Sequence, residues 1–380
     1  MYLYNATMNY NPLLTPINNG LNNTNIYEIK PLISPDCLLD ELPITQKALE
    51  NVLLYREIIK NILNKEDHRL LVVVGPCSIH DTKAALEYAV KLKNLSIELQ
   101  DSIVIVMRTY FEKPRTTIGW KGLINDPDLN DSFNINKGLR IARKLLIDIN
   151  EIGLPTALEF LDTISPQYIS DLISWGAIGA RTTESQLHRE LVSGLSMPIG
   201  FKNSTTGNIK IIIDAIKSSR YSHKFLGINS NGISSIIKTR GNPYTHAILR
   251  GADHGPNYHK EFISTFSKIL IDHNISPNIM IDCSHGNSNK SYKEQIKVVD
   301  YLIQLINSGN NDIMGLMIES NIKAGNQKLT NNLEYGVSIT DECIDWNTTV
   351  LLLKKLKYAV QNNNGKKYNL IWWSENLNIT

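Results

Sequence analysis

The run Leu70-Leu71-Val72-Val73-Val74 is a short apolar segment of strand type, and it is followed by Ala84–Leu95, whose apolar residues recur at helical spacing. The same alternation of strand and helix continues along the chain as far as Gln361. Strands that are joined through helices run parallel, because a parallel pair needs a long crossover connection. The repeated unit therefore predicts a parallel sheet with crossover helices.

Eight apolar runs of this type occur in the chain. They are Leu71–Val74, Ile103–Met107, Thr156–Phe160, Ile178–Ala180, Met197–Phe201, His246–Leu249, Ile279–Ile281 and Gly315–Ile318. The other helical patterns of the repeat are Gly138–Ile149, Pro166–Ser174, Ile209–Ser218, Lys260–His273, Tyr292–Asn307 and Thr348–Gln361. Eight such units predict an α/β protein with a (β/α)8 TIM barrel. The chain has no glycine-rich dinucleotide or P-loop motif, which disfavours a doubly wound nucleotide-binding fold.

The barrel is expected over residues 66–360, after an N-terminal extension (1–65) and before a C-terminal tail (361–380). Within the extension, we expect about the first 25 residues to be poorly ordered and Thr45–Asn64 to form a helix. Two connections are longer than a barrel requires, near 109–136 and 221–244. The second of them has the pattern of a β-hairpin, Lys224–Ile228 and Ile233–Thr239 around Asn231-Gly232. Long insertions of this kind are usually lids or ligand sites.

Composition places the protein in a broad class. The chain has 380 residues and a formal net charge of +2, which disfavours a nucleic-acid or membrane-surface binder. Hydrophobic residues make up 42% and charged residues 20%, as in a globular protein with a core. Four cysteines are too few for a disulfide scaffold, and no secretory signal or membrane span is visible. These features predict a cytoplasmic protein.

A charged or reactive residue lies at or just after the carboxyl end of every predicted strand. In chain order, these residues are Cys77, Arg108, Glu159, Arg181, Lys202, Arg250, His285 and Glu319. All eight carboxyl ends of a parallel barrel open on the same face, where active sites of this fold lie. We therefore expect these side chains to meet at one mouth.

The strand-end residues divide into two chemical sets. The cations, with two more from the first long connection, are Arg108, Lys113, Arg115, Arg181, Lys202 and Arg250. Positive groups at this density would repel one another unless anions bind, and phosphate or carboxylate is the natural partner. The second set is Cys77, His285, Glu319 and, beyond the last strand, Asp341. Its sulfur, nitrogen and oxygen donors suit Mn²⁺, Fe²⁺ or Zn²⁺.

Each of these residues also has a purely structural interpretation. Cys77 alone is more often a small buried hydrophobe, and His285 alone is more often a hydrogen-bonded loop residue. Glu319 could pair with Lys323, and Asp341 could cap a helix. The arginines could form structural ion pairs. Only the joint placement at strand ends favours a metal site with an anion site.

Several long strings resemble class I 3-deoxy-D-arabino-heptulosonate 7-phosphate (DAHP) synthases. They are Gly75-Pro76-Cys77-Ser78-Ile79-His80-Asp81, Met107-Arg108-Thr109-Tyr110-Phe111-Glu112-Lys113-Pro114-Arg115-Thr116-Thr117, Gly179-Ala180-Arg181-Thr182-Thr183-Glu184-Ser185-Gln186, Gly200-Phe201-Lys202-Asn203, Asp282-Cys283-Ser284-His285-Gly286-Asn287 and Ser338-Ile339-Thr340-Asp341. The resemblance extends from about Pro31 to Leu356 and implies the same (β/α)8 barrel.

The resemblance implies the first step of the shikimate pathway, in which phosphoenolpyruvate and D-erythrose 4-phosphate condense with release of phosphate. It assigns a divalent metal to Cys77, His285, Glu319 and Asp341. It assigns phosphoenolpyruvate to Arg108, Lys113, Glu159, Ala180, Arg181, Lys202 and Arg250. By the same resemblance, Arg115 and Thr116 hold the phosphate of erythrose 4-phosphate. Lys113 is implied to protonate the new alkoxide, and His285 could assist the addition of water.

The resemblance also implies feedback inhibition by an aromatic amino acid, with Pro166, Leu195, Ser196 and Gly227 as candidate residues. Strings such as Phe225-Leu226-Gly227-Ile228-Asn229 are most similar to the tyrosine-sensitive form. In that form a glycine at position 227 would leave room for the hydroxyl of tyrosine. Alternatively, the glycine serves the backbone of the hairpin. A homodimer or homotetramer is expected by analogy with the family.

Two loops depart from the family pattern. Ser204-Thr205-Thr206-Gly207 replaces Gly-Thr-Asp-Gly, and Gly251 to Tyr258 is one residue longer and lacks a lysine. Four other functions stay open on the sequence. They are a synthase that condenses phosphoenolpyruvate with another sugar phosphate such as arabinose 5-phosphate, a metal-dependent hydrolase, a non-catalytic sensor of an aromatic amino acid and, least favoured, a nucleic-acid-binding module. The last is disfavoured because the cations stand singly at strand ends and not in a stripe.

Overall fold

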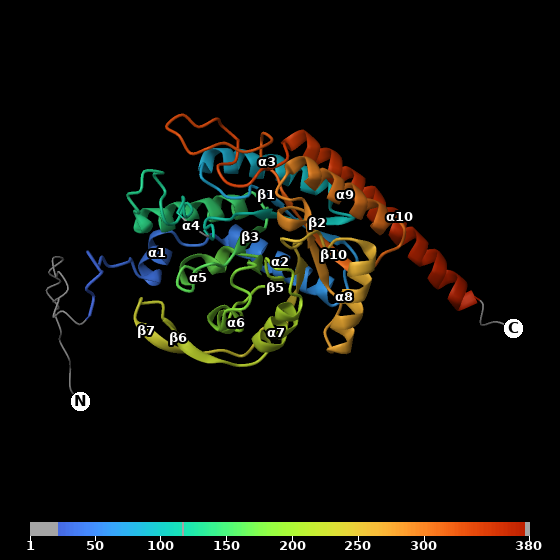
Figure 1. The fold of residues 1–380 in the computed structure, drawn as a ribbon, viewed down its shortest axis with the longest axis horizontal. Coiled ribbons are helices and arrows are strands. Elements are labelled where there is room, and N and C mark those ends of the chain that lie inside the picture. The colour runs from blue at the N-terminus through green and yellow to red at the C-terminus, as the bar shows by residue number, and fades with distance from the viewer. Residues whose placement is uncertain (1–21, 116–117, 377–380) are drawn as a thin grey trace.

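The computed structural model describes residues 22–115 and 118–376, and its centre is a closed barrel of parallel strands (Figure 1). The barrel strands are β1 (Leu70–Gly75), β2 (Ile103–Arg108), β3 (Thr156–Glu159), β4 (Trp175–Ile178), β5 (Ile199–Lys202), β8 (Thr245–Leu249), β9 (Ile279–Asp282) and β10 (Ile313–Glu319). Their order around the barrel is β1-β10-β9-β8-β5-β4-β3-β2. This arrangement confirms the predicted (β/α)8 barrel.

Helices surround the barrel on its outside and at one end. They are α1 (Pro35–Glu41), α2 (Gln46–Leu63), α3 (Thr82–Leu99), α4 (Ile135–Glu151), α5 (Pro166–Ile169), α6 (Gln186–Val192), α7 (Lys210–Ser219), α8 (Lys260–Asp272), α9 (Tyr292–Asn307) and α10 (Trp346–Asn376). Helices α9 and α10 pack side by side (Figure 1). Helix α10 projects beyond the barrel and extends to Asn376, so most of the predicted C-terminal tail is helical. Most of the predicted N-terminal tail, residues 1–21, lies outside the described residues.

The strands separate two hydrophobic cores. In β1, Leu71 and Val73 belong to an inner cluster, whereas Val72 and Val74 belong to the outer cluster that contacts the helices. This division follows from the alternation of side chains along a strand. Every residue of β1 is buried, because the barrel is packed on both faces. Each fully buried aliphatic side chain contributes about 1.5–3 kcal/mol to folding.

Helix α2 closes the amino-terminal end of the barrel. Its residues Ile59, Ile62 and Leu63 pack in the inner cluster, and Asn278 donates a hydrogen bond of 2.8 Å to the Leu63 carbonyl. The end of the barrel opposite the strand carboxyl ends is therefore filled by apolar side chains, and the functional face is the other one.

The structure corrects two predicted elements. The fourth strand is Trp175–Ile178, whereas the sequence pattern suggested Ile178–Ala180. Gly179 instead begins a turn, since its carbonyl accepts hydrogen bonds from the amides of Thr182 and Thr183. The expected helix Pro166–Ser174 is divided into the short α5 and the 3₁₀ helix η1 (Ser170–Leu172). It cannot continue to Ser174 as a regular helix, because β4 begins at Trp175. Helices α1 and α6 were not predicted.

Both long insertions have the expected positions. Strands β6 (Lys224–Ile228) and β7 (Ser234–Lys238) form an antiparallel hairpin outside the barrel, which confirms the predicted hairpin (Figure 1). The hairpin turn contacts the start of α1, where the Asp36 amide donates to the Ser230 carbonyl at 2.8 Å. In the first insertion, Arg115 Nε donates to the Trp120 carbonyl at 2.8 Å. That bond joins two described residues of the loop after β2 to each other.

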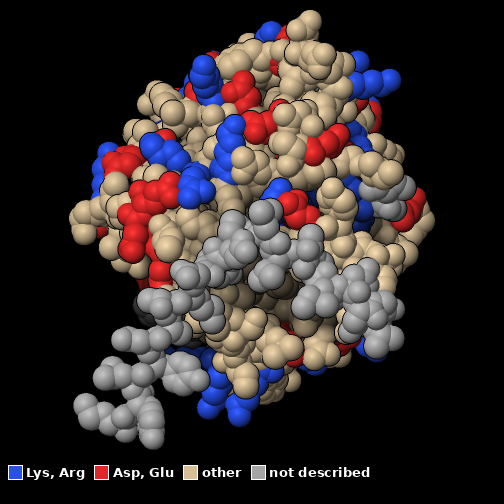
Figure 2. All heavy atoms as spheres, turned by 90° about the vertical axis from the view of Figure 1, so that its left-hand side faces the viewer, with Lys and Arg blue, Asp and Glu red and all other residues tan. Residues whose placement is uncertain are grey.

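The surface charge is mixed. Figure 2 shows the face at the left of Figure 1, where Lys and Arg side chains are interspersed with Asp and Glu side chains. A face of this kind has no continuous positive stripe that could follow a nucleic-acid backbone. Among the described residues, no helix combines the length and the apolar character that a membrane span requires.

Candidate active site

A cavity of about 240 Å³ opens at the carboxyl ends of the barrel strands, and we call it the mouth cavity. Its lining residues are Arg108, Tyr110, Lys113, Pro114, Arg115, Ile118, Glu159, Ala180, Arg181, Lys202, Thr205, Arg250, His285, Lys290 and Asp341. All six predicted cations, four from the strand ends and two from the first long connection, are among them. Thr116, which the resemblance assigned to a substrate, lies outside the described residues.

Arg108 ends β2 and is fully buried. Its Nη2 donates to Glu319 Oε1 at 3.0 Å, and its guanidinium carbon lies 3.9 Å from the ring centre of Tyr110. Burial alone would lower the pKa of Arg108, but Tyr110 and Glu319 outweigh it and raise that pKa. Nη1 of Arg108 has no hydrogen-bond partner among the described residues, and the same is true of Nη1 of Arg250. Two buried guanidinium groups are thus left with a donor for a ligand.

Lys202 ends β5 and stands between two carboxylates. Its Nζ lies 3.1 Å from Asp282 Oδ2 and 3.5 Å from Glu159 Oε2. Burial would lower the pKa of Lys202, but Asp282 and Glu159 raise it above the ordinary value. The pKa of Glu159 is lowered, since Lys202 and Lys113 outweigh the opposite effect of burial. All three groups therefore stay charged, and Lys202 can hold an anion.

Lys113 lies next to Cys77, with Nζ 3.0 Å from Sγ. Burial raises the pKa of Cys77 to about 11, and the negative charge of Glu319 adds to the rise. The same neighbours act oppositely on Lys113: burial would lower its pKa, but Cys77, Glu319 and Asp341 raise it. The pair is therefore a neutral thiol beside an ammonium group, which has a proton to donate.

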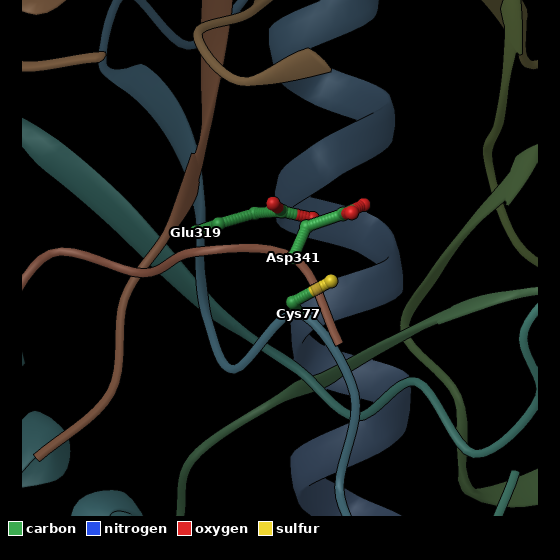
Figure 3. A group of neighbouring side chains, drawn as sticks. All are labelled: Cys77, Glu319 and Asp341. Atoms are coloured by element: carbon green, nitrogen blue, oxygen red, sulfur yellow. The ribbon is translucent and has the colours of Figure 1, made fainter. Parts of the chain in front are cut away.

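Cys77, Glu319 and Asp341 form a tight group, which we call the Cys–Glu–Asp cluster (Figure 3). One ligand atom from each residue lies within 4.8 Å of the others. Cys77 follows β1, Glu319 ends β10 and Asp341 comes from the loop before α10. Burial raises the pKa of Asp341, but Lys113 and His285 outweigh it and lower that pKa. Close anionic oxygens and a sulfur suit a borderline divalent cation, so the donor set fits a metal.

His285 borders the cluster but does not belong to the tight group. Its Nε2 lies 3.8 Å from Glu319 Oε1, and its Nδ1 lies 2.9 Å from Asp282 Oδ2. The carboxylate of Asp282 therefore faces one ring nitrogen and leaves the other directed to Glu319. The structure thus brings three of the four predicted metal ligands together and places the fourth beside them.

Sequence reasoning missed several residues of the site, among them Asp282, Tyr110, Thr205 and Lys290. Asp282 is the last residue of β9 and is fully buried between Lys202 and His285. The rule that identified the other strand-end residues could have found it, since Asp282 directly follows an apolar run. Tyr110 carried no such signal, because only its stacking under Arg108 shows its role.

The two loops that depart from the family pattern lie against each other. The Asp253 amide donates to the Thr205 carbonyl at 2.8 Å. Gly207 has a positive φ of 83°, and a β-carbon on it would lie 2.8 Å from the β-carbon of Ala252. Thr205 also lines the mouth cavity. The two loops therefore contact each other at the rim, through Thr205 and Gly207, which match the family pattern, and through Ala252 and Asp253 of the longer loop.

The predicted regulatory residues lie away from the mouth cavity. Pro166 begins α5, Leu195 and Ser196 follow α6, and Gly227 lies in β6, which packs against α6. Gly227 does not have a positive φ, so the interpretation that it serves the hairpin backbone is wrong. A β-carbon at this position would lie 2.8 Å from Cγ1 of Ile237. A side chain at position 227 would therefore have to displace the side chain of Ile237.

Glu112 precedes Lys113 and has no role assigned so far. Its side chain is buried, and Ser165 Oγ donates to its Oε2 at 3.2 Å. Burial raises the pKa of Glu112 to about 7, and the nearby Asp162 and Glu159 add to the rise. Near neutral pH this carboxyl is therefore poised between its neutral and charged forms.

Comparison with known proteins gives a consistent result. Residues 41–354 match the DAHP synthetase I family. The chain is 53% identical over 342 residues to the Escherichia coli (strain K12) phospho-2-dehydro-3-deoxyheptonate aldolase, Phe-sensitive, covering 90% of this chain and 97% of that protein. It is 49% identical over 347 residues to the tyrosine-inhibited aldolase of Schizosaccharomyces pombe (strain 972), covering 90% of this chain and 93% of that one.

A solved structure of phospho-2-dehydro-3-deoxyheptonate aldolase from Francisella tularensis SCHU S4 has the same fold. It superposes with a TM-score of 0.88 at 52% sequence identity, and the match covers 89% of this chain and 99% of the other. The similarity therefore includes the whole barrel and the strand ends that carry the mouth cavity.

The raised pKa of Glu112 predicts a pH-dependent stability. The unfolded chain ionises this group near pH 4.5 and the folded protein near pH 7, so its contribution is complete below pH 4.5 and is lost as pH rises through 7. The difference corresponds to about 3 kcal/mol at most. Glu112→Gln has no ionisable group at this position. The difference in unfolding free energy between the variant and the wild type should therefore move in favour of the variant as the pH rises from 5 to 8. Denaturant unfolding at several pH values measures the difference.

The control is Glu184→Gln, which changes an exposed carboxyl in the loop after β4. Its unfolding free energy should follow that of the wild type at every pH. If the curves of Glu112→Gln and the wild type run parallel from pH 5 to pH 8, the buried carboxyl has an ordinary pKa.

Proposed function

The chain belongs to the DAHP synthetase I family, and from that premise we propose that it condenses phosphoenolpyruvate with D-erythrose 4-phosphate and water. The products are 3-deoxy-D-arabino-heptulosonate 7-phosphate and inorganic phosphate, so the reaction is the first step of the shikimate pathway. The observation that carries the proposal is the mouth cavity, which is lined by six cations and by Asp341 of the Cys–Glu–Asp cluster. Two phosphorylated reactants are the ligands that such a cavity would favour.

Phosphoenolpyruvate occupies the inner part of the mouth cavity in this proposal. It has a carboxylate and a phosphate, and the buried cations Arg108, Lys202 and Arg250 provide donors for both. The unpartnered Nη1 atoms of the two arginines support this assignment. Arg181, Lys113 and Ala180 complete the wall, and Glu159 keeps Lys202 in place at 3.5 Å.

Erythrose 4-phosphate enters from the rim. Arg115 is exposed there, and its Nε is already held by the Trp120 carbonyl, so the remaining guanidinium donors can bind a phosphate. We assign Thr116 to the same phosphate because it is the next residue in the matching string. The aldehyde end of the sugar would then point inward, toward the Cys–Glu–Asp cluster.

The metal ligands in this proposal are Cys77, Glu319, Asp341 and His285. The first three are close enough to share one ion, and His285 borders Glu319. These residues would hold a divalent ion of the Mn²⁺, Fe²⁺ or Zn²⁺ class, which when bound would supply Lewis-acid polarisation of the aldehyde. Ser284 Oγ donates to Glu319 Oε2 at 2.8 Å and Asp282 faces His285, so the ligands are oriented by their neighbours.

The reaction needs one carbon–carbon bond, one water and one proton at the new alkoxide. Carbon 3 of phosphoenolpyruvate attacks the aldehyde carbon, positive charge develops at carbon 2, and water adds there. One proton of that water restores the ammonium of Lys113. The other passes to the phosphate as the bond from carbon 2 to the phosphate oxygen breaks and carbon 2 becomes a carbonyl. Lys113 donates the proton to the alkoxide, since its raised pKa keeps it charged beside the aldehyde. Arg108 and Lys202 fix the approach of the reactants and stabilise charge on the leaving phosphate.

The alternatives fit the site less well. A metal-dependent hydrolase would need more histidine ligands, but the described cluster has a cysteine and two carboxylates with one histidine beside it. A non-catalytic sensor would not need Lys113 beside Cys77 at 3.0 Å. A synthase for arabinose 5-phosphate differs in the string Lys113-Pro114-Arg115-Thr116 and is separated by assay.

Tyrosine is the proposed feedback inhibitor, with Pro166, Leu195, Ser196 and Gly227 at its site. One relative of similar identity is tyrosine-inhibited, while others are Phe-sensitive or Trp-sensitive. Overall similarity therefore does not identify the inhibitor, and the assignment to tyrosine is based on Gly227. We also propose a cytoplasmic homodimer or homotetramer. The exposed apolar residues Leu226 and Ile236, which face each other across the hairpin, support an assembly that covers them.

The purified protein should release phosphate only when phosphoenolpyruvate and erythrose 4-phosphate are both present. EDTA should abolish this activity, and Mn²⁺, Fe²⁺ or Zn²⁺ should restore it. Replacing erythrose 4-phosphate by arabinose 5-phosphate should reduce kcat/KM by more than about 100-fold, because the rim is built for the shorter sugar. Equal activity with the two sugars would support the rival synthase, and no phosphate release would support the sensor.

Cys77→Ala should lower metal-dependent turnover by more than about 100-fold, even after chelation and addition of fresh metal, because the cluster loses its sulfur ligand. Cys283→Ala is the matched control, since Cys283 is equally buried but packs in the outer core. It should retain most of the activity. Full activity of Cys77→Ala would show that Cys77 is not a ligand.

Tyrosine should inhibit the enzyme more strongly than phenylalanine or tryptophan does. Gly227→Ser should raise the tyrosine concentration for half inhibition at least about 10-fold, because the added side chain overpacks the hairpin against Ile237. Ser234→Ala, on the exposed face of β7, should not change inhibition. Phosphate-release assays with each amino acid measure these effects, and the absence of any tyrosine response would contradict the assignment.

A further inference from the structure

The segment after β9 has an unusual backbone. His285, Asn289 and Lys290 all have positive φ, at 54°, 50° and 60°. Asparagine tolerates this left-handed conformation, but a lysine rarely adopts it, and glycine is the usual residue. Strain of this kind persists only where the surroundings impose it, and it occurs preferentially at functional sites.

The surroundings of Lys290 impose this conformation. The Lys290 amide donates to the His285 carbonyl at 2.9 Å, and the next amide, of Ser291, donates to the Ser288 carbonyl at 3.0 Å. Asn287 Nδ2 binds the Asp282 carbonyl at 2.8 Å and fixes the segment to the end of β9. Ser291 then caps α9, so the chain has no freedom to relax between the strand and the helix.

The side chain of Lys290 belongs to the mouth cavity. Lys290 is exposed, yet it is one of the residues that line the cavity, so it lies at the rim. The described part of the chain offers its ammonium group no hydrogen bond and no ion pair within 4.0 Å. Asp341 and Arg115 line the same cavity as Lys290. The pKa of Asp341 is raised by burial and lowered by Lys113 and His285, and Lys290 and Arg115 lower it further.

The distribution of charge in the proposed reaction leaves a role for this lysine. Five cations surround the phosphoenolpyruvate position, whereas a single cation, Arg115, is assigned to the phosphate of erythrose 4-phosphate. That phosphate is nearly a dianion at neutral pH, and it would enter at the exposed rim where Lys290 and Arg115 lie. A second positive charge there would match its charge and fix the far end of the sugar.

We propose that Lys290, together with Arg115, binds the phosphate of erythrose 4-phosphate, and that the left-handed backbone at Lys290 is retained for this contact. The inference rests on the proposed function. Lys290 is thus a substrate-binding residue that recognises the sugar phosphate and does not contact phosphoenolpyruvate. Lys290 lies five residues after His285, so the same loop reaches both the rim and the Cys–Glu–Asp cluster.

Two substitutions separate the charge from the backbone. Lys290→Gln keeps an unbranched polar side chain, although a shorter one, and the strained backbone, but it removes the charge. Lys290→Gly removes the charge and relieves the strain, because glycine adopts positive φ readily. Steady-state kinetics of the intact enzyme, with each substrate varied in turn, should show KM for erythrose 4-phosphate at least about 10-fold higher in both variants. KM for phosphoenolpyruvate should stay within about 2-fold of the wild type.

Thermal unfolding gives an independent readout. Lys290→Gly should unfold at a higher temperature than the wild type while it binds erythrose 4-phosphate more weakly, whereas a lysine without a functional role would show the first effect alone. Lys290→Arg should retain most of the affinity, since it keeps a cation. Lys293→Gln is the matched control, because Lys293 is exposed three residues further along in α9, and its kinetics should not change.

Three results would overturn the inference. Wild-type KM for erythrose 4-phosphate in both Lys290→Gln and Lys290→Gly would exclude the contact. An equal rise in both KM values would show a general effect on the cavity. A fall in metal affinity that parallels the rise in KM would show that Lys290 acts through Asp341. If the wild type itself fails to turn over the two substrates, the proposed function fails as well, so the two failures are distinguishable.

Discussion

The parallel direction of all eight barrel strands is the constraint on which this site depends. Because the strands are parallel and the barrel is closed, their carboxyl ends share one face, and residues more than 200 positions apart become neighbours. Arg108 and Glu319 illustrate this: they end β2 and β10, and their side chains meet at 3.0 Å although both are fully buried. A buried pair of this kind needs further partners, and the mouth cavity is assembled around it.

Charge balance then organises the mouth cavity into two regions. In the inner region, carboxylates from Asp282, Glu159 and Glu319 surround Lys202 and Arg108, so the cations stay charged without a ligand. At the rim, Arg115 and Lys290 are exposed to solvent. The cavity can therefore hold one anion that is shielded from water in the inner region and one that stays partly hydrated at the rim. The Cys–Glu–Asp cluster lies beside both positions.

The periphery of the barrel carries features that the chemistry does not need. The β6–β7 hairpin lies outside the barrel and contacts α1 and α6, and the two altered loops pack on each other at the rim. The buried members of the two core clusters include no residue of the hairpin, and its Ile228 packs against the outer cluster. A barrel of this kind can vary its loops and attach regulation while the strand-end residues stay in position.

The sequence by itself determined the class of fold and most of the strand-end set. Apolar runs such as Leu71–Val74 depend only on local pattern, and the (β/α)8 rule converts their number into a common mouth. The sequence pattern misplaced β4, because the apolar run of that strand continues into the turn at Gly179. Only the tertiary structure decided that His285 lies beside the cluster and that Asp282 joins Lys202 to it, since such distances depend on the packing of segments that are far apart in sequence. The left-handed backbone at Lys290 likewise follows from long-range packing and left no mark in the local pattern.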